Sequence, residues 1–180
     1  MEFKEVKYPE YGIVIREREQ MSGRYFADVL PEYDRAEIDI PEEVNGMKII
    51  GLNCLNELHH NVRKIRLSRA VEYVYFAFGR LGGRYLEIEI DEENPHIFTD
   101  GKAVYSKNGE LILFFAGGCT SYEVLSGTRV IKDSAFCNFP NLRHIKLPHG
   151  IEVIDTNAFS KMTALRGVNI PDALDDTIEL

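Results

Sequence analysis

The chain has 180 residues, which suits one domain or one uninterrupted array of repeats. Hydrophobic residues make up 44% of it, which is enough for a sizeable core and argues against global disorder. The net charge of -8 argues against a nucleic-acid binder or a protein of anionic membrane surfaces, because both need a basic face.

The first 37 residues form no part of a repeat. They open with MEFKEVKYPE, which lacks the apolar core of a signal peptide, and no stretch of the chain approaches 18 apolar residues. We therefore expect no membrane insertion, and either a cytoplasmic protein or an export signal outside this chain. The segments YGIVIRERE and GRYFADVL predict two strands joined at residues 20–23. Their hairpin would cover the open end of a repeat array, as such arrays require.

A repeat with a period of 23 residues runs through most of the remaining chain. Its clearest copies are IKDSAFCNFPNLRHIKLP at residues 131–148 and IDTNAFSKMTALRGVNIP at residues 154–171. The shift places Phe136 on Phe159 and predicts that both rings are buried. A fixed period in the twenties is typical of a solenoid, in which each unit buries its apolar face only against its neighbours.

Each unit predicts a short strand, a second extended segment and a short helical turn. Inward Ile145 and outward Lys146 alternate in HIKLP, and the proline ends the pairing. Asp155 or Thr156 is available to cap the helical turn. The fold class predicted is therefore an α/β repeat solenoid with short parallel strands. About four units can be traced, at residues 38–67, 65–90, 122–147 and 145–170, with Cys54-Leu55 and Ala77-Phe78 in the Ala-Phe slots of the first two.

The spacing between residues 90 and 124 is 34 residues instead of 23, and an insertion at about residues 94–118 accounts for the difference. Two apolar runs, 103–105 and 111–115, flank Ser-Lys-Asn-Gly, which predicts a β-hairpin. The second run is apolar on both faces. Either the solenoid core covers one face and the segment NPHIF at 94–98 covers the other, or Phe114 and its neighbours form an association patch.

These motifs resemble those of the BspA-like leucine-rich repeat proteins, whose unit ends in Leu-x-x-Ile-x-Ile-Pro after an Ala-Phe pair. IPEEVNGMKIIG, IKDSAFCNFPNLRHIKLP, IDTNAFSKM and DGKAVYSKNGELILFF all resemble segments of these proteins, so the resemblance covers about residues 38–171. It implies a leucine-rich-repeat solenoid between an N-terminal cap, 1–37, and a tail, 172–180. It also implies a bacterial protein, at the cell surface or secreted, that serves adhesion and protein recognition.

No residue pattern indicates catalysis, a metal or a cofactor, so we predict a protein that is not an enzyme. His59 and His60 lie near Cys54 but lack a second ligand cluster with zinc spacing. Cys137 and His144 occupy repeat slots that the next unit fills with Ser and Gly, and no third group would orient them as a nucleophile and its base. We expect the three cysteines to be free thiols.

The outward strand positions form the only extended surface that the repeat builds. One row reads Asp39, Arg66, Glu89, Glu123, Lys146 and Asn169, and the row before it reads Glu37, Lys64, Glu87, Ser121, His144 and Gly167. Neighbours in the rows mostly carry opposite charges. Such pairs stabilise adjacent strands, and they equally suit a polar recognition face.

We therefore predict a protein partner that binds this face. The residues assigned to the contact are Arg66, Glu89, Glu123 and Lys146, with Phe114 and Phe115 of the hairpin as apolar anchors. The function predicted is a non-catalytic recognition module, adhesin-like or scaffolding. The alternative is a structural stacking or self-assembly domain of a larger protein, and a homo-oligomer is consistent with it.

Overall fold

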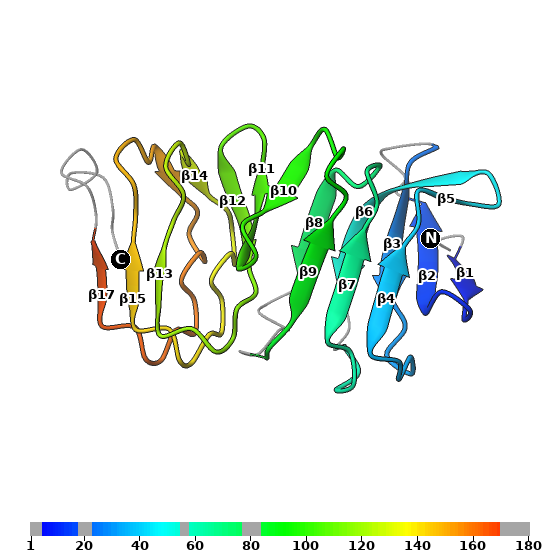
Figure 1. The fold of residues 1–180 in the computed structure, drawn as a ribbon, viewed down its shortest axis with the longest axis horizontal. Helices are drawn as coiled ribbons and strands as arrows, with labels where there is room; N and C mark the ends of the chain where they lie inside the picture. The colour runs from blue at the N-terminus through cyan, green and yellow to red at the C-terminus, as the bar shows by residue number, and fades with distance from the viewer. Residues whose placement is uncertain (1–4, 18–22, 55–57, 77–83, 170–180) are drawn as a thin grey trace.

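The computed structural model of the chain describes residues 5–17, 23–54, 58–76 and 84–169. Within these ranges the backbone forms seventeen strands and no helix. The strands stack into a β-solenoid of about six turns, which runs from the N-terminal cap at one end to β17 (Gly167–Asn169) at the other (Figure 1). Each turn of the solenoid is called a coil below.

The helical part of the predicted α/β class is not confirmed for the described residues. The segments after β14 (Val130–Ile131) and β16 (Val153–Ile154), where the sequence predicted helical turns, are successive tight turns instead. Ser134, Asn138 and Lys161 have φ values of 60°, 64° and 59° there. A right-handed helix cannot contain residues in this left-handed region, so the backbone bends at each of them. The Ala-Phe slots proposed at 55 and 77–78, and the side chain of Cys54, lie outside the described residues.

The N-terminal cap is larger than the sequence predicted. Its two expected strands pair antiparallel, and a third strand precedes them. The last of the three continues in parallel into the solenoid, so the cap joins the repeat array as part of one sheet. The strands of this sheet are β1 (Glu5–Tyr8), β2 (Ile13–Glu17), β3 (Tyr25–Val29), β5 (Glu43–Val44), β6 (Met47–Cys54) and β8 (Tyr73–Phe76).

One side of the solenoid, the first face, carries the predicted outward rows. It consists of two separate three-stranded parallel sheets, not one continuous ladder. The N-terminal block contributes β4 (Glu37–Ile40), β7 (Lys64–Leu67) and β9 (Glu87–Ile90). The C-terminal block contributes β13 (Ser121–Glu123), β15 (His144–Lys146) and β17 (Gly167–Asn169). Figure 1 shows the strands of the N-terminal block inclined to those of the C-terminal block.

The predicted hairpin separates the two blocks. It consists of β11 (Ala103–Ser106) and β12 (Glu110–Phe114), and β10 (Ile97–Thr99) pairs with β11. The NPHIF segment thus adds a third strand beside the hairpin and does not lie across its face. Every residue of β11 is buried, which places the strand inside the solenoid. On the second face, opposite the first, β12 continues in parallel to β14 (Val130–Ile131) and β16 (Val153–Ile154).

The core of the C-terminal block is a column of aromatic rings. The Phe114 ring lies 5.3 Å from that of Phe136 and 4.9 Å from that of Phe139, measured between centroids. Phe136 stacks in turn on Phe159 at 5.5 Å. Phe136 is fully buried as predicted, whereas Phe159 in the last coil is half-buried and packs against the core from its edge.

Candidate recognition surfaces

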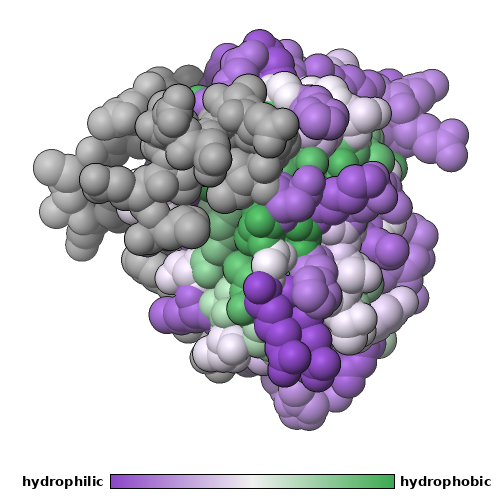
Figure 2. Space-filling view, turned by 90° about the vertical axis from the view of Figure 1, so that its left-hand side faces the viewer, coloured by the Kyte–Doolittle hydropathy of each residue, from purple (hydrophilic) through white to green (hydrophobic). Residues whose placement is uncertain are grey.

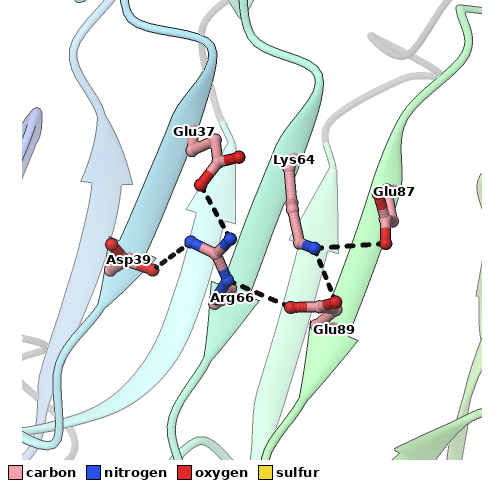
Figure 3. Close-up of polar contacts among 6 residues, drawn as sticks. All are labelled: Glu37, Asp39, Lys64, Arg66, Glu87 and Glu89. Carbon is pink, nitrogen blue, oxygen red and sulfur yellow. Dashed lines mark hydrogen bonds and ion pairs between the residues drawn. The ribbon is translucent and has the colours of Figure 1, made fainter.

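The first face of the N-terminal block carries a closed network of ion pairs (Figure 3). The register sets Asp39 beside Arg66 and Arg66 beside Glu89, as the sequence predicted. The Arg66 guanidinium lies 3.0 Å from Asp39 Oδ1, 3.0 Å from Glu89 Oε2 and 2.7 Å from Glu37 Oε2. Lys64 Nζ lies 2.5 Å from Glu89 Oε1 and 3.3 Å from Glu87. Both cations are thus held by carboxylates of the neighbouring strands.

This network shifts the pKa values of its members in the directions that keep them charged. Hydrogen bonds to Asp39 and Glu37 raise the pKa of Arg66, and the hydrogen bond to Glu89 raises the pKa of Lys64. The hydrogen bond from Lys64 lowers the pKa of Glu89. All three side chains face solvent, which screens such interactions. The network therefore joins adjacent strands, and a partner that bound Arg66 or Glu89 would have to replace existing contacts.

The first face of the C-terminal block carries fewer charges. Lys146 Nζ lies 2.6 Å from Glu123 Oε1, and both side chains are exposed. Asn169 accepts a hydrogen bond from the backbone N–H of Leu147. Glu89 and Glu123, which the sequence placed side by side in one ladder, belong to different sheets because the inserted hairpin separates the blocks. A partner-binding role for Arg66, Glu89, Glu123 and Lys146 stays a prediction.

Phe114 and Phe115 are not the exposed anchors that the sequence predicted. Their exposed fractions are 0% and 1%. Phe114 fills the centre of the aromatic column between Tyr122 and Phe136. The apolar residues of β12 are buried in the solenoid core except Ile112, which is half-buried. Neither ring can contact a partner in this fold. The solenoid core covers one face of the hairpin, as one of the two interpretations held, but the segment at 94–98 does not cover the other face.

A groove of about 720 Å³ lies between the two blocks on the second face, and we call it the junction groove. Its walls come from β8 on one side and from β12 and the segments after β14 and β16 on the other. Tyr73 and Tyr75 of β8 are 42% and 41% exposed within it, and Ile112 of β12 is half-buried. Exposed aromatic rings in a concave site are typical of binding surfaces.

Charged side chains surround these rings. Lys132 Nζ lies 3.8 Å from Glu110 and 3.6 Å from Asp155, and His96 lies 3.6 Å from Glu72. Sequence analysis missed this site. The signal was present in VEYVYF, where tyrosines occupy two alternate positions of a strand and must share one face. The groove itself depends on the inclination of the two blocks, which no local pattern encodes.

The described residues contain no group of three or more His, Cys, Asp or Glu that could hold a metal ion. The rings of His59 and His60 lie 4.2 Å apart between centroids, and His59 Nδ1 accepts a hydrogen bond from the backbone of Asn61. Cys119 and Cys137 are free thiols. Burial raises the pKa of Cys137, which opposes formation of a nucleophilic thiolate. None of the described residues forms a helix able to cross a membrane.

The C-terminal block also matches a known repeat family. Residues 113–179 fit the family model described as "BspA type Leucine rich repeat region (6 copies)". These residues are similar to the BspA-type leucine-rich repeats. The resemblance predicted from the sequence is confirmed, and the BspA-type region coincides with the block whose coils are regular and aromatic. No curated protein matches the sequence.

Two solved bacterial protein structures share the fold. The pneumococcal vaccine antigen PcpA aligns with a TM-score of 0.55 and 19% identity, over 72% of this chain and 33% of that one. A leucine-rich repeat protein from Eubacterium ventriosum aligns with a TM-score of 0.51 and 11% identity, over 88% of this chain and 70% of that one. At these identities the likeness shows the fold alone. The chain spans about a third of the length of the pneumococcal structure.

Proposed function

We propose that this chain is a non-catalytic protein-recognition module, adhesin-like or scaffolding, and that it binds its partner in the junction groove. The observation that carries the proposal is the pair of half-exposed rings, Tyr73 and Tyr75, in a concave site between the two blocks. Tyrosine is enriched in the few residues that supply most of the affinity at protein interfaces. The BspA-type repeats support the proposal, since repeat proteins of this kind are typically binding modules.

The chemistry of the two faces favours the groove over the first face. Arg66 and Lys64 are already held by carboxylates, so a partner would gain little by replacing those contacts. Tyr73 and Tyr75 present apolar surface to solvent, and a partner that covers them removes this surface from water. A protein partner anchored on the tyrosines therefore gains affinity without breaking an existing ion pair of the solenoid.

The test is affinity capture on the immobilised chain, with three versions compared. The parent and Tyr11→Ser should retain the same protein partner, and the double variant Tyr73→Ser, Tyr75→Ser should lose it. Tyr11 is the matched control because it is 41% exposed and lies outside the groove. Circular dichroism first establishes that all three are folded. Equal retention by the three versions would place recognition elsewhere, and retention of no protein by the parent would contradict the function itself.

The alternative, a stacking or self-assembly domain, is favoured by one observation at the C-terminal end. The last coil holds Phe159, Met162, Leu165 and Val168 half-buried, whereas their counterparts one coil earlier are buried. Figure 2 shows apolar residues gathered in the middle of this end. Sedimentation of the parent and of Leu165→Asp distinguishes the two functions. An oligomer that Leu165→Asp dissociates would support assembly through this end.

A further inference from the structure

Among the described residues, strand β8 has one open edge. It pairs in parallel with β6 on one side, and no described residue pairs with its other side. The neighbouring strand of the second face, β12, cannot close this edge because it already pairs with β11 and β14. The junction groove therefore begins where the sheet of the N-terminal block ends.

The backbone groups of two residues face the groove. The N–H of Glu72 donates to the carbonyl of Ile50 at 2.7 Å, so Glu72 is directed toward β6. Successive residues of a parallel strand direct their N–H and C=O groups to opposite sides. Tyr73 and Tyr75 therefore direct theirs away from β6 and into the groove. Within the part of the chain that the structure describes, no hydrogen bond satisfies these groups.

The side chains around the open edge suit an extended segment. Tyr73 and Tyr75 lie on one face of β8, and side chains at alternate positions of an added strand would lie beside their rings. Ile112 of β12 supplies apolar surface on the opposite wall. The groove volume of about 720 Å³ is within the range of sites that hold small ligands or short peptide segments.

The charge of the groove indicates what such a segment carries. Its lining includes two lysines, Lys107 and Lys132, and an excess of carboxylates, which are Glu72, Glu110, Asp133 and Asp155. The two lysines balance half of these four charges. The chain as a whole has a net charge of -8, so its long-range field attracts cations as well.

We propose that the junction groove binds an extended peptide segment with basic side chains, which pairs with the backbone of β8 at Tyr73 and Tyr75. This inference rests on the proposed function and names the class of partner segment for the same site. The added strand extends the sheet of the N-terminal block by β-augmentation, a known mode of peptide recognition. Its basic side chains face the carboxylates of the groove, where Glu110 and Asp155 share the single cation of Lys132 and together keep a net negative charge.

The probe is a fluorescent octapeptide of alternating lysine and valine, titrated onto the whole chain. Its comparison peptide alternates glutamate and valine. The lysine peptide should bind at least about tenfold more tightly, and added salt should weaken its binding because the attraction is screened. A third peptide, the lysine sequence with alternate backbone nitrogens methylated, keeps the charges but cannot pair with β8. It should bind at least about tenfold more weakly than the unmethylated peptide.

Two substitutions at one position separate the backbone from the ring. Tyr75→Ser removes the ring and keeps the N–H, whereas Tyr75→Pro removes both without touching a hydrogen bond to β6. Tyr75→Pro should bind the lysine peptide several-fold more weakly than Tyr75→Ser. The methylated peptide makes the same test on the unchanged protein if the proline variant does not fold.

A matched pair of double variants tests the charges. Glu110→Gln, Asp155→Asn removes two charges from the groove, and Glu37→Gln, Asp39→Asn removes two from the first face. Only the substitutions in the groove should weaken binding of the lysine peptide, by about fivefold or more.

The proposal is wrong if the glutamate peptide binds as tightly as the lysine peptide, if methylation of the backbone does not weaken binding, or if no peptide binds. A protein partner captured through Tyr73 and Tyr75 in that case would leave the proposed function standing, so the two failures are distinguishable.

Discussion

The two blocks hold their coils together by different means. In the N-terminal block, first-face strands of four residues carry an ionic network outside, and aliphatic Ile38, Ile65 and Ile88 stack in register inside. In the C-terminal block, first-face strands of three residues carry the ion pair of Lys146 with Glu123, and a column of aromatic rings fills the interior. Strand-to-strand pairing thus dominates one block, and ring stacking dominates the other.

This difference explains why the sequence repeat is regular in one block only. A ring in the column contacts the rings of the coils before and after it, so its slot must recur at a fixed distance along the chain. A strand ladder requires only that strands meet in register, and the chain between them can vary in length. The BspA-type match accordingly covers residues 113–179 and does not reach the N-terminal block.

The largest expected effect is the loss of a ring from the column. Phe136→Ala should lower the free energy of unfolding by about 3–5 kcal/mol, the usual cost of truncating a buried phenylalanine. Phe159→Ala should cost less because that ring is half-buried. Urea unfolding of the two variants measures both values.

The same experiment tests whether the column ends in the last coil. An effect of Phe159→Ala as large as that of Phe136→Ala would mean that other residues cover the last coil. Tyr85→Ala is the control because Tyr85 is 69% exposed, and it should change stability little.

The sequence predicted the register of the solenoid well, because alternation and the 23-residue period are local signals. Ile145 and Val168 pair as the shift requires, and Asn108-Gly109 forms the hairpin turn. Predictions that depended on how distant segments pack against one another were wrong or incomplete. Phe114 looked exposed because β12 is apolar on both faces, and only the folded arrangement shows that strands and rings surround it. The groove and the split of the polar rows were missed for the same reason.

The junction between the blocks depends on Asn94. This side chain is 1% exposed and donates to the carbonyls of Ser68 and Val71 at 3.0 and 2.9 Å. Its Oδ1 accepts from the N–H groups of His96 and Ile97. It therefore ties the turn after β7 to β10.

Asn94→Ala should destabilise the protein by about 2–4 kcal/mol, because buried backbone groups lose their partners. Hydrogen exchange should also quicken in β10. Asn157→Ala is the matched control, since Asn157 is exposed and its side-chain amide donates to the exposed carboxylate of Asp133. If the amides of β10 exchange as slowly in Asn94→Ala as in the parent, Asn94 does not hold the junction.

A buried tyrosine pair should make stability depend on alkaline pH. The Tyr122 hydroxyl donates to Asp100 at 2.6 Å and shares a hydrogen bond with Tyr105. Burial raises the pKa of both tyrosines above their ordinary value of 10.0, and the bond to Asp100 raises that of Tyr122 further. A raised pKa in the folded state contributes stability that is fully present below pH 10 and is lost as the pH rises above it.

The free energy of unfolding should accordingly fall above about pH 10. It should fall less in the double variant Tyr105→Phe, Tyr122→Phe than in the parent. Urea unfolding between pH 8 and 11, compared at each pH, measures the difference in slope. Absorbance of tyrosinate should show two tyrosines that ionise only on unfolding. If the free energy of unfolding depends on pH equally in the two proteins, ionisation of this tyrosine pair is not coupled to folding.

The smallest expected effect is the difference between removing a cation from the first face of one block and removing one from the first face of the other. Arg66 is held by Glu37, Asp39 and Glu89, whereas Lys146 is paired with one carboxylate of the described residues, Glu123. Arg66→Met leaves three carboxylates without that cation, so it should lower the melting temperature more than Lys146→Met. Both effects should shrink as salt is added, because the groups are exposed and screened.

The pH dependence of this effect identifies the charges that cause it. Hydrogen bonds from Lys64 and Arg66 lower the pKa of Glu89 below its ordinary value of 4.5. A lowered pKa contributes stability that is present above pH 4.5 and is lost as the pH falls below it. The difference in melting temperature between parent and Arg66→Met should therefore close under acidic conditions. If it persists there, packing of the Arg66 side chain is the cause. If Arg66→Met melts earlier but binds a captured partner like the parent, the network serves the coils alone.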